Sequence, residues 1–202
     1  MATITTWVTR HRRASAAGVI AVVVGLAAVV DWPHQAGAGD LRADFASYAT
    51  QVNDDLQSCS LEVEQTISAY NQITAGVSDK RETAAGIASQ TALDCTPLGS
   101  SAIEDLGTLQ PPRSLARFGL DQGTQRLYSW CFSDGVDVAQ DIEHLLSSPG
   151  DPALLAKLRA QLSDMQVQAA GAQGLFDQTA ASLGTAPVSF GLDSVRPSVL
   201  VG

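Results

Sequence analysis

Apolar side chains recur with the period of an α-helix along most of the chain. The longest run extends from Leu41 to Tyr70, where apolar positions are spaced by three or four residues, about 3.6 on average. The run contains neither proline nor glycine, and Gly76-Val77-Ser78 ends it. A periodic stretch of this length is typical of a coiled coil or of an elongated helical bundle.

A second periodic stretch follows and carries two helix-boundary signals. Asp79 and Glu82 match the Asp-x-x-Glu capping box at its start. Its apolar positions continue to Leu98, and Pro97 lies among them. This proline either kinks the helix or begins a new one with Thr96 as its cap. The pattern resumes beyond this point and ends at a double proline.

Two further stretches complete the helical pattern. Ser114 is the candidate N-cap of the third, and the glycines within that stretch predict an irregular helix. The fourth begins at Asp151-Pro152, a cap residue followed by a first-turn proline. Its apolar positions recur about every 3.5 residues, close to a coiled-coil seam, until Gly184 ends it.

These four stretches predict an all-α fold. Residues 40–184 show no alternating β pattern, and short turns place consecutive helices side by side in opposite directions. We therefore predict an up-down antiparallel bundle of three or four long helices over residues 40–184. Residues 185–202 lack a helical period, so they are expected to form a C-terminal tail that is either poorly ordered or laid against the bundle.

The first thirty residues differ from the rest in charge and hydropathy. Three arginines precede residues 14–30, a stretch of 17 residues that is almost entirely apolar or small. As a helix it would be about 25 Å long, enough to cross a hydrocarbon core. We therefore predict a transmembrane anchor or uncleaved signal segment at 14–30 and a linker at 31–39. The positive-inside rule places residues 1–13, which carry the arginines, in the cytoplasm.

The cell-membrane location has a secreted alternative. Ala36-Gly37-Ala38 matches a small-x-small cleavage site, which would release the bundle after Ala38. Trp7 and Trp32 flank the apolar segment as interface aromatics do, and they favour the retained single-pass anchor. In either case the bundle is expected outside the cytoplasm. Small residues spaced by three or four positions along residues 14–28 also allow two such helices to pair in the membrane.

Charge and motif content exclude several functions. The formal net charge of −9 argues against binding to nucleic acid, whose phosphates attract basic side chains. Asp141-x-x-His144 is a single weak half of a di-iron motif, so a solvated histidine near a helix end is the preferred interpretation. Asp134, Asp137 and Asp141 form an acidic stripe that we interpret as a solvated face. We therefore predict no catalytic, cofactor-binding or metal-binding residues.

Three cysteines are the candidate site residues. Cys59, Cys95 and Cys131 lie 36 residues apart, twice, and the midpoints of the two intervals fall at the first predicted turn and beside Pro111-Pro112. Equal distances from a turn mean equal heights on antiparallel helices, because each residue adds the same rise. Each cysteine also lies on an apolar stripe. The sequence therefore predicts one layer of three thiols in the core.

Three chemistries are open to this thiol layer. An oxidising compartment favours a disulfide, and the alternatives are free buried thiols or a metal or thiol-catalytic site, although no Cys-x-x-Cys occurs. The first and third helices of a square bundle are diagonal, which makes Cys95 the predicted shared partner. The double proline fixes the second hairpin firmly, so Cys95–Cys131 is the preferred pair. Cys59 is then left over to link two copies.

The absence of a concentrated polar constellation predicts a function without catalysis. The leading hypothesis is a membrane-anchored extracytoplasmic protein with a structural or protein-interaction role in the cell envelope, whose partner is another envelope protein or a second copy. The alternative is a bundle that binds a lipid or another apolar small ligand. Small residues in the fourth helix, Ala169, Ala172 and Ala180, favour the alternative because they leave room for a cavity.

Overall fold

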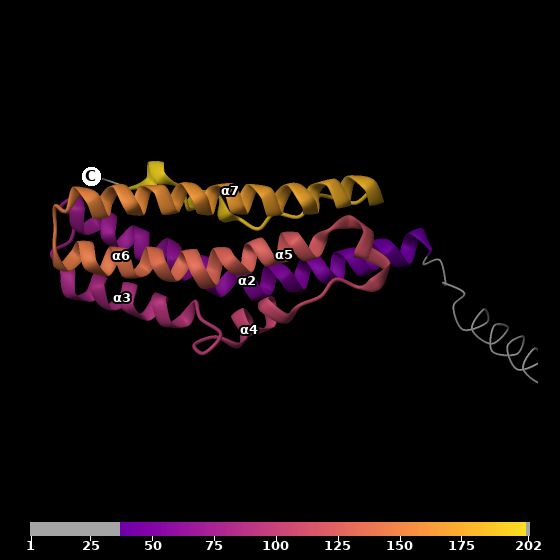
Figure 1. The fold of residues 1–202 in the computed structure, drawn as a ribbon, viewed down its shortest axis with the longest axis horizontal. Coiled ribbons are helices and arrows are strands. Elements are labelled where there is room, and N and C mark those ends of the chain that lie inside the picture. The colour runs from indigo at the N-terminus through magenta and orange to yellow at the C-terminus, as the bar shows by residue number, and fades with distance from the viewer. Residues whose placement is uncertain (1–36, 201–202) are drawn as a thin grey trace, which may run out of the picture. The chain divides into compact units, whose positions relative to one another are not determined.

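The computed structural model describes residues 37–200, and every regular element in this range is helical. The helices form four packed arms (Figure 1). The first arm is α2, the second contains α3 and α4, the third contains α5, the π-helical turn η2 and α6, and the fourth is α7. Their bounds are Ala38–Thr74 (α2), Arg81–Asp94 (α3), Ser101–Thr108 (α4), Leu120–Ser129 (α5), Trp130–Gly135 (η2), Val136–Ser147 (α6) and Pro152–Leu183 (α7). The predicted helical bundle is thus confirmed for the described residues.

The predicted cytoplasmic segment 1–13 and membrane anchor 14–30 lie outside the described residues, as does most of the linker. Within residues 37–200, no helix combines the length and the apolar character needed to cross a membrane.

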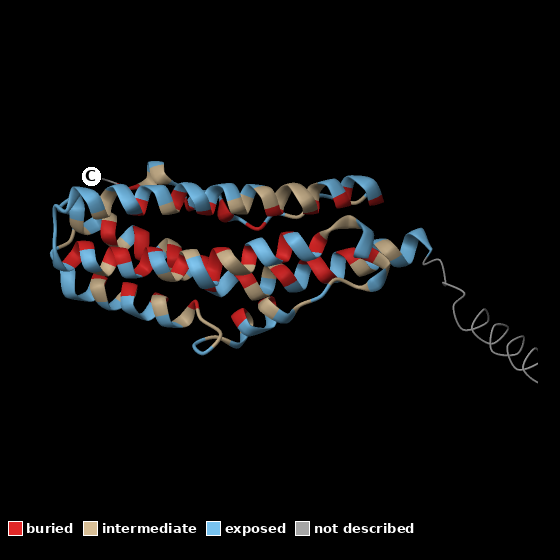
Figure 2. Ribbon diagram, viewed as in Figure 1, coloured by how far each residue is buried: buried red, intermediate tan, exposed pale blue. Residues whose placement is uncertain are grey.

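The apolar stripe of α2 forms the centre of the core. From Phe45 to Tyr70 every stripe position predicted from the sequence is buried, and the inward faces of the other arms are buried against it (Figure 2). Burial of one large aliphatic or aromatic side chain contributes about 1.5–3 kcal/mol, so this stripe is a major source of stability. At one end of the bundle the Phe176 ring packs against Phe45 and Tyr48, with ring centroids 6.2 Å and 6.1 Å away.

Contacts with α2 define the direction of the other arms. Thr66 donates a hydrogen bond to Thr91 of α3 over 2.9 Å, and Arg42 donates to the Leu183 carbonyl at the end of α7 over 2.8 Å. Arg42 lies at the beginning of α2 and Leu183 at the end of α7, whereas Thr66 and Thr91 lie at about equal distances from the turn that joins α2 to α3. The second and fourth arms therefore run antiparallel to α2.

The cross-section is rhombic rather than square. In Figure 1, α2 and the α5–α6 arm lie in the middle, with α7 on one side and α3 and α4 on the other. Residue contacts agree with this view, because α2 contacts α5, η2 and α6 directly and α3 packs closely against α6. The first and third arms therefore lie along the short diagonal. The expectation that they would be kept apart as diagonal helices was wrong.

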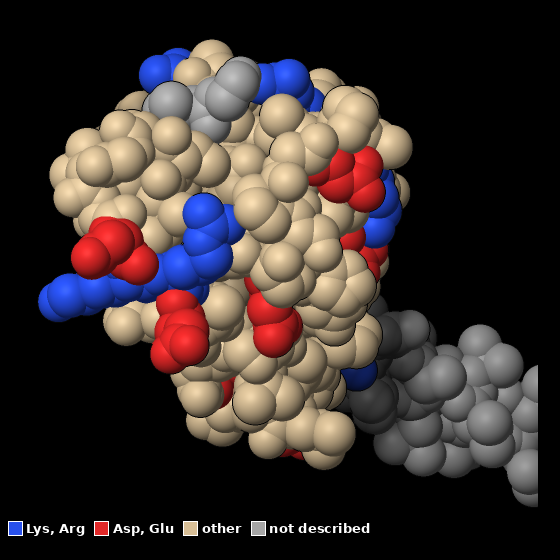
Figure 3. Space-filling view, turned by 90° about the vertical axis from the view of Figure 1, so that its left-hand side faces the viewer, with Lys and Arg blue, Asp and Glu red and all other residues tan. Residues whose placement is uncertain are grey.

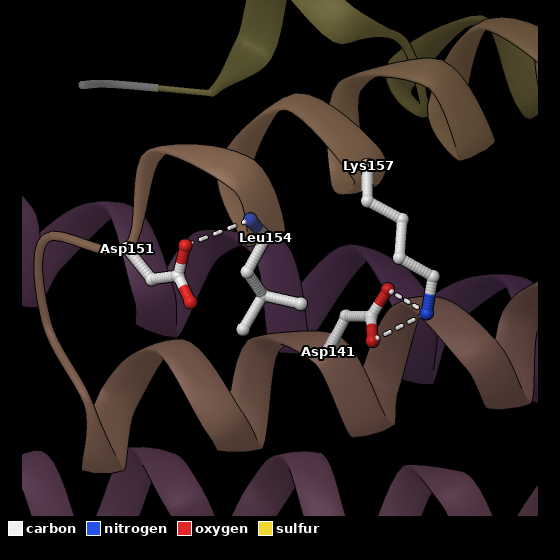
Figure 4. A network of polar contacts seen from close by, with 4 residues as sticks. All are labelled: Asp141, Asp151, Leu154 and Lys157. Carbon is white, nitrogen blue, oxygen red and sulfur yellow. Dashed lines mark hydrogen bonds and ion pairs between the residues drawn. The ribbon is translucent and has the colours of Figure 1, made fainter.

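Two of the predicted helix boundaries were wrong and one is confirmed. α3 begins at Arg81, and no side chain caps it, because the chain turns at Asp79 and enters the helix two residues later. Ser114 does not cap a long helix either. Its hydroxyl donates to Asp44 of α2 over 2.5 Å from a short turn, η1 (Arg113–Phe118). Asp151, by contrast, accepts hydrogen bonds from the amides of Ala153 and Leu154 at the start of α7 (Figure 4).

The tail packs along the bundle as far as residue 200. Phe190 contacts Phe176 edge to face with ring centroids 4.9 Å apart, and its amide donates to Gln173 of α7 over 3.3 Å. Farther along, Asn71 of α2 donates to the Val199 carbonyl over 2.7 Å. Of the two forms expected for the tail, the structure has the one laid against the bundle. Two short turns, η3 (Leu192–Ser194) and η4 (Pro197–Val199), interrupt it.

Replacement of the confirmed cap provides a test of the fold. Asp151→Ala removes the acceptor for two amides at the start of α7, and we expect the free energy of unfolding to fall by about 1 kcal/mol. Asp79→Ala is the matched control, because this exposed residue precedes a helix without a side-chain cap. Its effect should stay within about 0.5 kcal/mol. Urea titration followed by circular dichroism measures both, and equal losses would contradict the assigned boundaries.

Candidate functional site: a buried thiol layer beside an apolar groove

The three cysteines meet in the core, as their spacing predicted. Cys59, Cys95 and Cys131 are each at most 1% exposed. The Sγ atoms of Cys59 and Cys95 are 2.7 Å apart, and the Cys131 thiol also interacts with Cys59. All three are present as free thiols in the structure. We refer to these three residues as the thiol layer.

Cys59 is the shared neighbour in the thiol layer, in place of Cys95. The sequence made Cys95 the shared partner because it treated the first and third arms as separated. In the rhombic bundle these two arms touch, so Cys131 of η2 reaches Cys59 of α2. The two sulfur atoms in direct contact are those of Cys59 and Cys95, whereas the sequence favoured Cys95 and Cys131.

Local breaks in the helices position the outer thiols. Cys95 caps the C-terminus of α3, where the chain leaves the helix for a turn. Cys131 lies in η2, a π-helical turn of the kind often found at functional sites. Gly135 ends this turn, and a Cβ atom there would lie 3.3 Å from Val63 and 3.6 Å from the Cys59 sulfur. The missing side chain therefore allows η2 to approach α2 closely at the thiol layer.

Burial and hydrogen bonding raise the pKa values of the thiols in this layer. Burial raises the pKa of Cys59 and of Cys131. The hydrogen bond with Cys59 raises the pKa of Cys95, and burial adds to this shift. The thiolate is the nucleophilic form of cysteine, so all three side chains are protonated and poorly nucleophilic near neutral pH.

Two acidic side chains flank the thiol layer on the α2–α3 side. Burial raises the pKa of Glu62, and the negative charge of Asp94 raises it further. One Glu62 carboxylate oxygen is buried without a hydrogen-bond partner among the described residues. A carboxylate in such a position is destabilised by desolvation and by the like charge beside it.

An apolar groove lies next to the thiol layer, at the turn that joins α3 to α4. The groove has a volume of about 660 Å³, and it is lined by Gln90, Leu93, Asp94, Thr96, Pro97, Leu98, Gly99 and Phe132. We call it the α3–α4 groove. Leu98 is 101% exposed, Leu93 is 61% exposed and Phe132 is 41% exposed. Large apolar side chains that gather on a surface in this way mark sites of interaction.

The turn beside the groove is built by Thr96 and Gly99. The Thr96 hydroxyl donates to the Leu93 carbonyl over 2.6 Å and accepts from the Gly99 amide over 3.1 Å. A Cβ atom on Gly99 would lie 2.1 Å from the Leu93 carbonyl oxygen, so only glycine fits there. Pro97 neither kinks a helix nor opens one, because it lies within this turn.

The sequence did not predict the groove. It placed Leu98 on the buried stripe of the second helix, but α3 ends at Asp94 and the turn directs Leu98 into solvent. The available signal was the short segment Thr96-Pro97-Leu98-Gly99. In it a helix-breaking proline precedes the large apolar residue Leu98 and a glycine follows it, a combination that is typical of a turn.

The acidic stripe of α6 also differs from expectation. Asp141 is only 5% exposed and forms an ion pair with Lys157 of α7 over 2.9 Å, which the interpretation as a solvated face had missed (Figure 4). Burial raises the pKa of Asp134, and Asp137 and Asp164 add to the shift. His144 is exposed near the end of α6, as expected. Among residues 37–200, no group of three or more His, Cys, Asp or Glu side chains is arranged to hold a metal ion.

No protein-family model, curated protein or solved structure matches this chain.

Three carboxyl groups with raised pKa values predict how the stability of the bundle depends on pH. A carboxyl group with a raised pKa in the folded state stabilises the fold fully below its ordinary pKa, and this contribution is lost as the pH rises through the folded-state value. Glu62, Asp55 and Asp134 all have raised pKa values. The free energy of unfolding should therefore be greater near pH 5 than near pH 7.5.

Glu62→Gln tests this assignment directly. The amide keeps the size of the side chain and removes the charge, so we expect a gain of about 0.5 kcal/mol near pH 7.5. The same substitution should give no gain near pH 4, about where an unperturbed glutamate is half protonated. Urea titrations of both proteins at the two pH values measure the difference. A gain of the same size at both would assign the effect to packing instead of charge.

Proposed function

We propose that this protein is a non-catalytic interaction module of the cell envelope. In this proposal residues 14–30 anchor the chain, residues 1–13 remain in the cytoplasm, and the bundle binds another envelope protein through the α3–α4 groove. The observation that carries the proposal is the group of exposed apolar side chains around that groove, led by the fully exposed Leu98. Three arginines before an apolar stretch of 17 residues support the anchor and its orientation.

Charge at the groove indicates the chemistry of the partner. Asp94 lines the groove, Glu62 lies beside Asp94, and none of the lining residues is basic. An apolar segment flanked by lysine or arginine complements this surface in both respects. A second copy of the chain is the weaker candidate, because the two acidic rims would repel each other. The face of the bundle shown in Figure 3 carries both basic and acidic groups among mostly uncharged residues.

A non-catalytic role agrees with the chemistry of the thiol layer. Its three sulfur atoms are buried, so a substrate in solution does not reach them. The layer therefore supports the bundle from within, while the groove beside it faces solvent.

Orientation in the membrane is the first test of the proposal. A periplasm-active reporter fused after Gly202 should be active, whereas a reporter that works only in the cytoplasm should be inactive at the same position. Fusion at the C-terminus keeps the packed tail intact, which a fusion after Gly184 would remove. Intact-mass measurement then separates the two forms: an N-terminus before Ala14 indicates the retained anchor, and one at Gly39 indicates secretion. Activity of the cytoplasmic reporter alone would reject the orientation.

Site-specific photocrosslinking tests the groove. A photoreactive phenylalanine analogue at position 98 of the full chain should crosslink, in the cells that produce it, to an apolar peptide of another protein with lysine or arginine nearby. Because Leu98 makes no buried contact, this substitution should leave the melting temperature unchanged. Val77 is the matched control position, since it is 76% exposed on the α2–α3 turn and does not line the groove.

The identity of the adduct decides between the hypotheses. An adduct with a partner peptide at position 98 and none at position 77 supports the proposal. An adduct with a second copy would replace it with self-association, and an adduct with lipid would favour the alternative of an apolar ligand. Equal crosslinking at both positions, or none at position 98, would remove the groove as a binding site.

A further inference from the structure

We propose that Cys59 and Cys95 form a disulfide bond, and that Cys131 remains a buried thiol beside it. This pairing differs from the Cys95–Cys131 pair that the sequence favoured. It joins the middle of α2 to the residue that ends α3.

Geometry selects this pair from the three that the layer allows. The Cys59 and Cys95 sulfurs are 2.7 Å apart, closer than two thiols in ordinary van der Waals contact. The Cys95 sulfur also lies 3.9 Å from the Cys59 carbonyl oxygen, so its side chain is directed at this residue of α2. Cys95 ends α3 at a turn, where the backbone adapts to a covalent bond more easily than in a helix interior.

Chain connectivity favours the same pair over Cys59–Cys131. Cys59 and Cys95 are separated by 36 residues, and Cys59 and Cys131 by 72. The shorter loop closes at a lower entropic cost. The α2–α3 hairpin is also held by the hydrogen bond between Thr66 and Thr91, which lies between the thiol layer and the turn and keeps the two helices in register.

The reaction is an ordinary thiol–disulfide exchange with a disulfide oxidant such as oxidised glutathione. One thiolate attacks the oxidant and displaces a glutathione thiolate, and the second cysteine then displaces the other glutathione from the mixed disulfide. One S–S bond forms in the protein and one breaks in the oxidant. The two cysteines lose two electrons and two protons, and two glutathione thiols carry them away.

Burial determines when the bond forms. In the folded bundle the thiols are protonated and enclosed, so an oxidant reaches them poorly. Oxidation therefore belongs to the partly folded chain, in which the α2–α3 hairpin has formed but the other arms do not yet enclose the thiols, and the finished bond is protected from reductants by burial. Once formed, the bond ties the start of the Thr96–Gly99 turn to α2, next to the α3–α4 groove.

Trypsin separates the three cysteines and makes the pairing directly measurable. Cleavage after Arg42, Lys80, Arg81, Arg113, Arg126 and Lys157 places Cys59 in peptide 43–80, Cys95 in 82–113 and Cys131 in 127–157. The full chain is reduced in denaturant, refolded in detergent with reduced and oxidised glutathione, denatured again, alkylated and digested without reductant. Mass spectrometry should find 43–80 linked to 82–113, with the alkyl group on 127–157.

Every other outcome overturns the proposal. A link between 82–113 and 127–157 would restore the pair favoured by the sequence, and a link between 43–80 and 127–157 would select the short diagonal. Three alkylated peptides would show that the layer keeps its thiols. The test does not depend on localisation or on a partner, so its failure is distinguishable from failure of the proposed function.

Single-cysteine variants provide the control. Cys131→Ala should retain the link and lose the free thiol. Cys59→Ala and Cys95→Ala should each abolish the link, and their melting temperatures should no longer respond to reductant. In the parent chain, reduction should lower the melting temperature by about 10 °C, since the bond closes a long loop. A melting temperature unchanged by reduction would contradict a structural disulfide, whatever the digest contains.

Discussion

The uninterrupted helix α2 is the constraint on which the bundle depends. Its buried stripe continues through a helix of 37 residues. Each of the other arms is fixed along the bundle axis by a hydrogen bond with α2. Thr91 pairs with Thr66, Thr124 pairs with Tyr48, and the Leu183 carbonyl accepts from Arg42. A break in α2 would therefore shift three arms relative to one another at once. The absence of proline and glycine from its stripe is the feature of the sequence that prevents this.

The other long arms tolerate breaks, and two of the breaks lie at the level of the thiol layer. α3 ends at Asp94 and η2 replaces α-helical geometry from Trp130 to Gly135. Small side chains at these points let the backbones approach, as Gly135 does beside Val63. The same breaks direct Leu98 and Phe132 away from the core. The layer and the α3–α4 groove are thus two results of one local arrangement.

Sequence periodicity predicted the long helices and the thiol layer because both follow from the spacing of residues along the chain. Equal spacing from two turns sets equal heights, whatever the details of packing. It did not predict Cys59 as the shared neighbour, since that depends on which diagonal of the bundle is short. It also failed where a local pattern had two solutions. Asp79 and Asp151 are both plausible caps, and only the course of the backbone before each helix distinguishes them. Leu98 fits a helical stripe, but the turn at Thr96–Gly99 removes it from the helix.

Buried thiols and exposed apolar side chains lie next to each other along the chain at this site. Cys95 belongs to the thiol layer and is fully buried, and Thr96 begins the turn that carries Leu98 into solvent. A partner can therefore contact the groove without access to a thiol, and an oxidant cannot reach a thiol through the groove while the bundle is folded. The turn nevertheless starts directly after Cys95, whose side chain is buried in the core. The thiol layer and the groove are therefore joined through the backbone at Cys95, so a change in the packing of the layer would also shift the turn that carries Leu98.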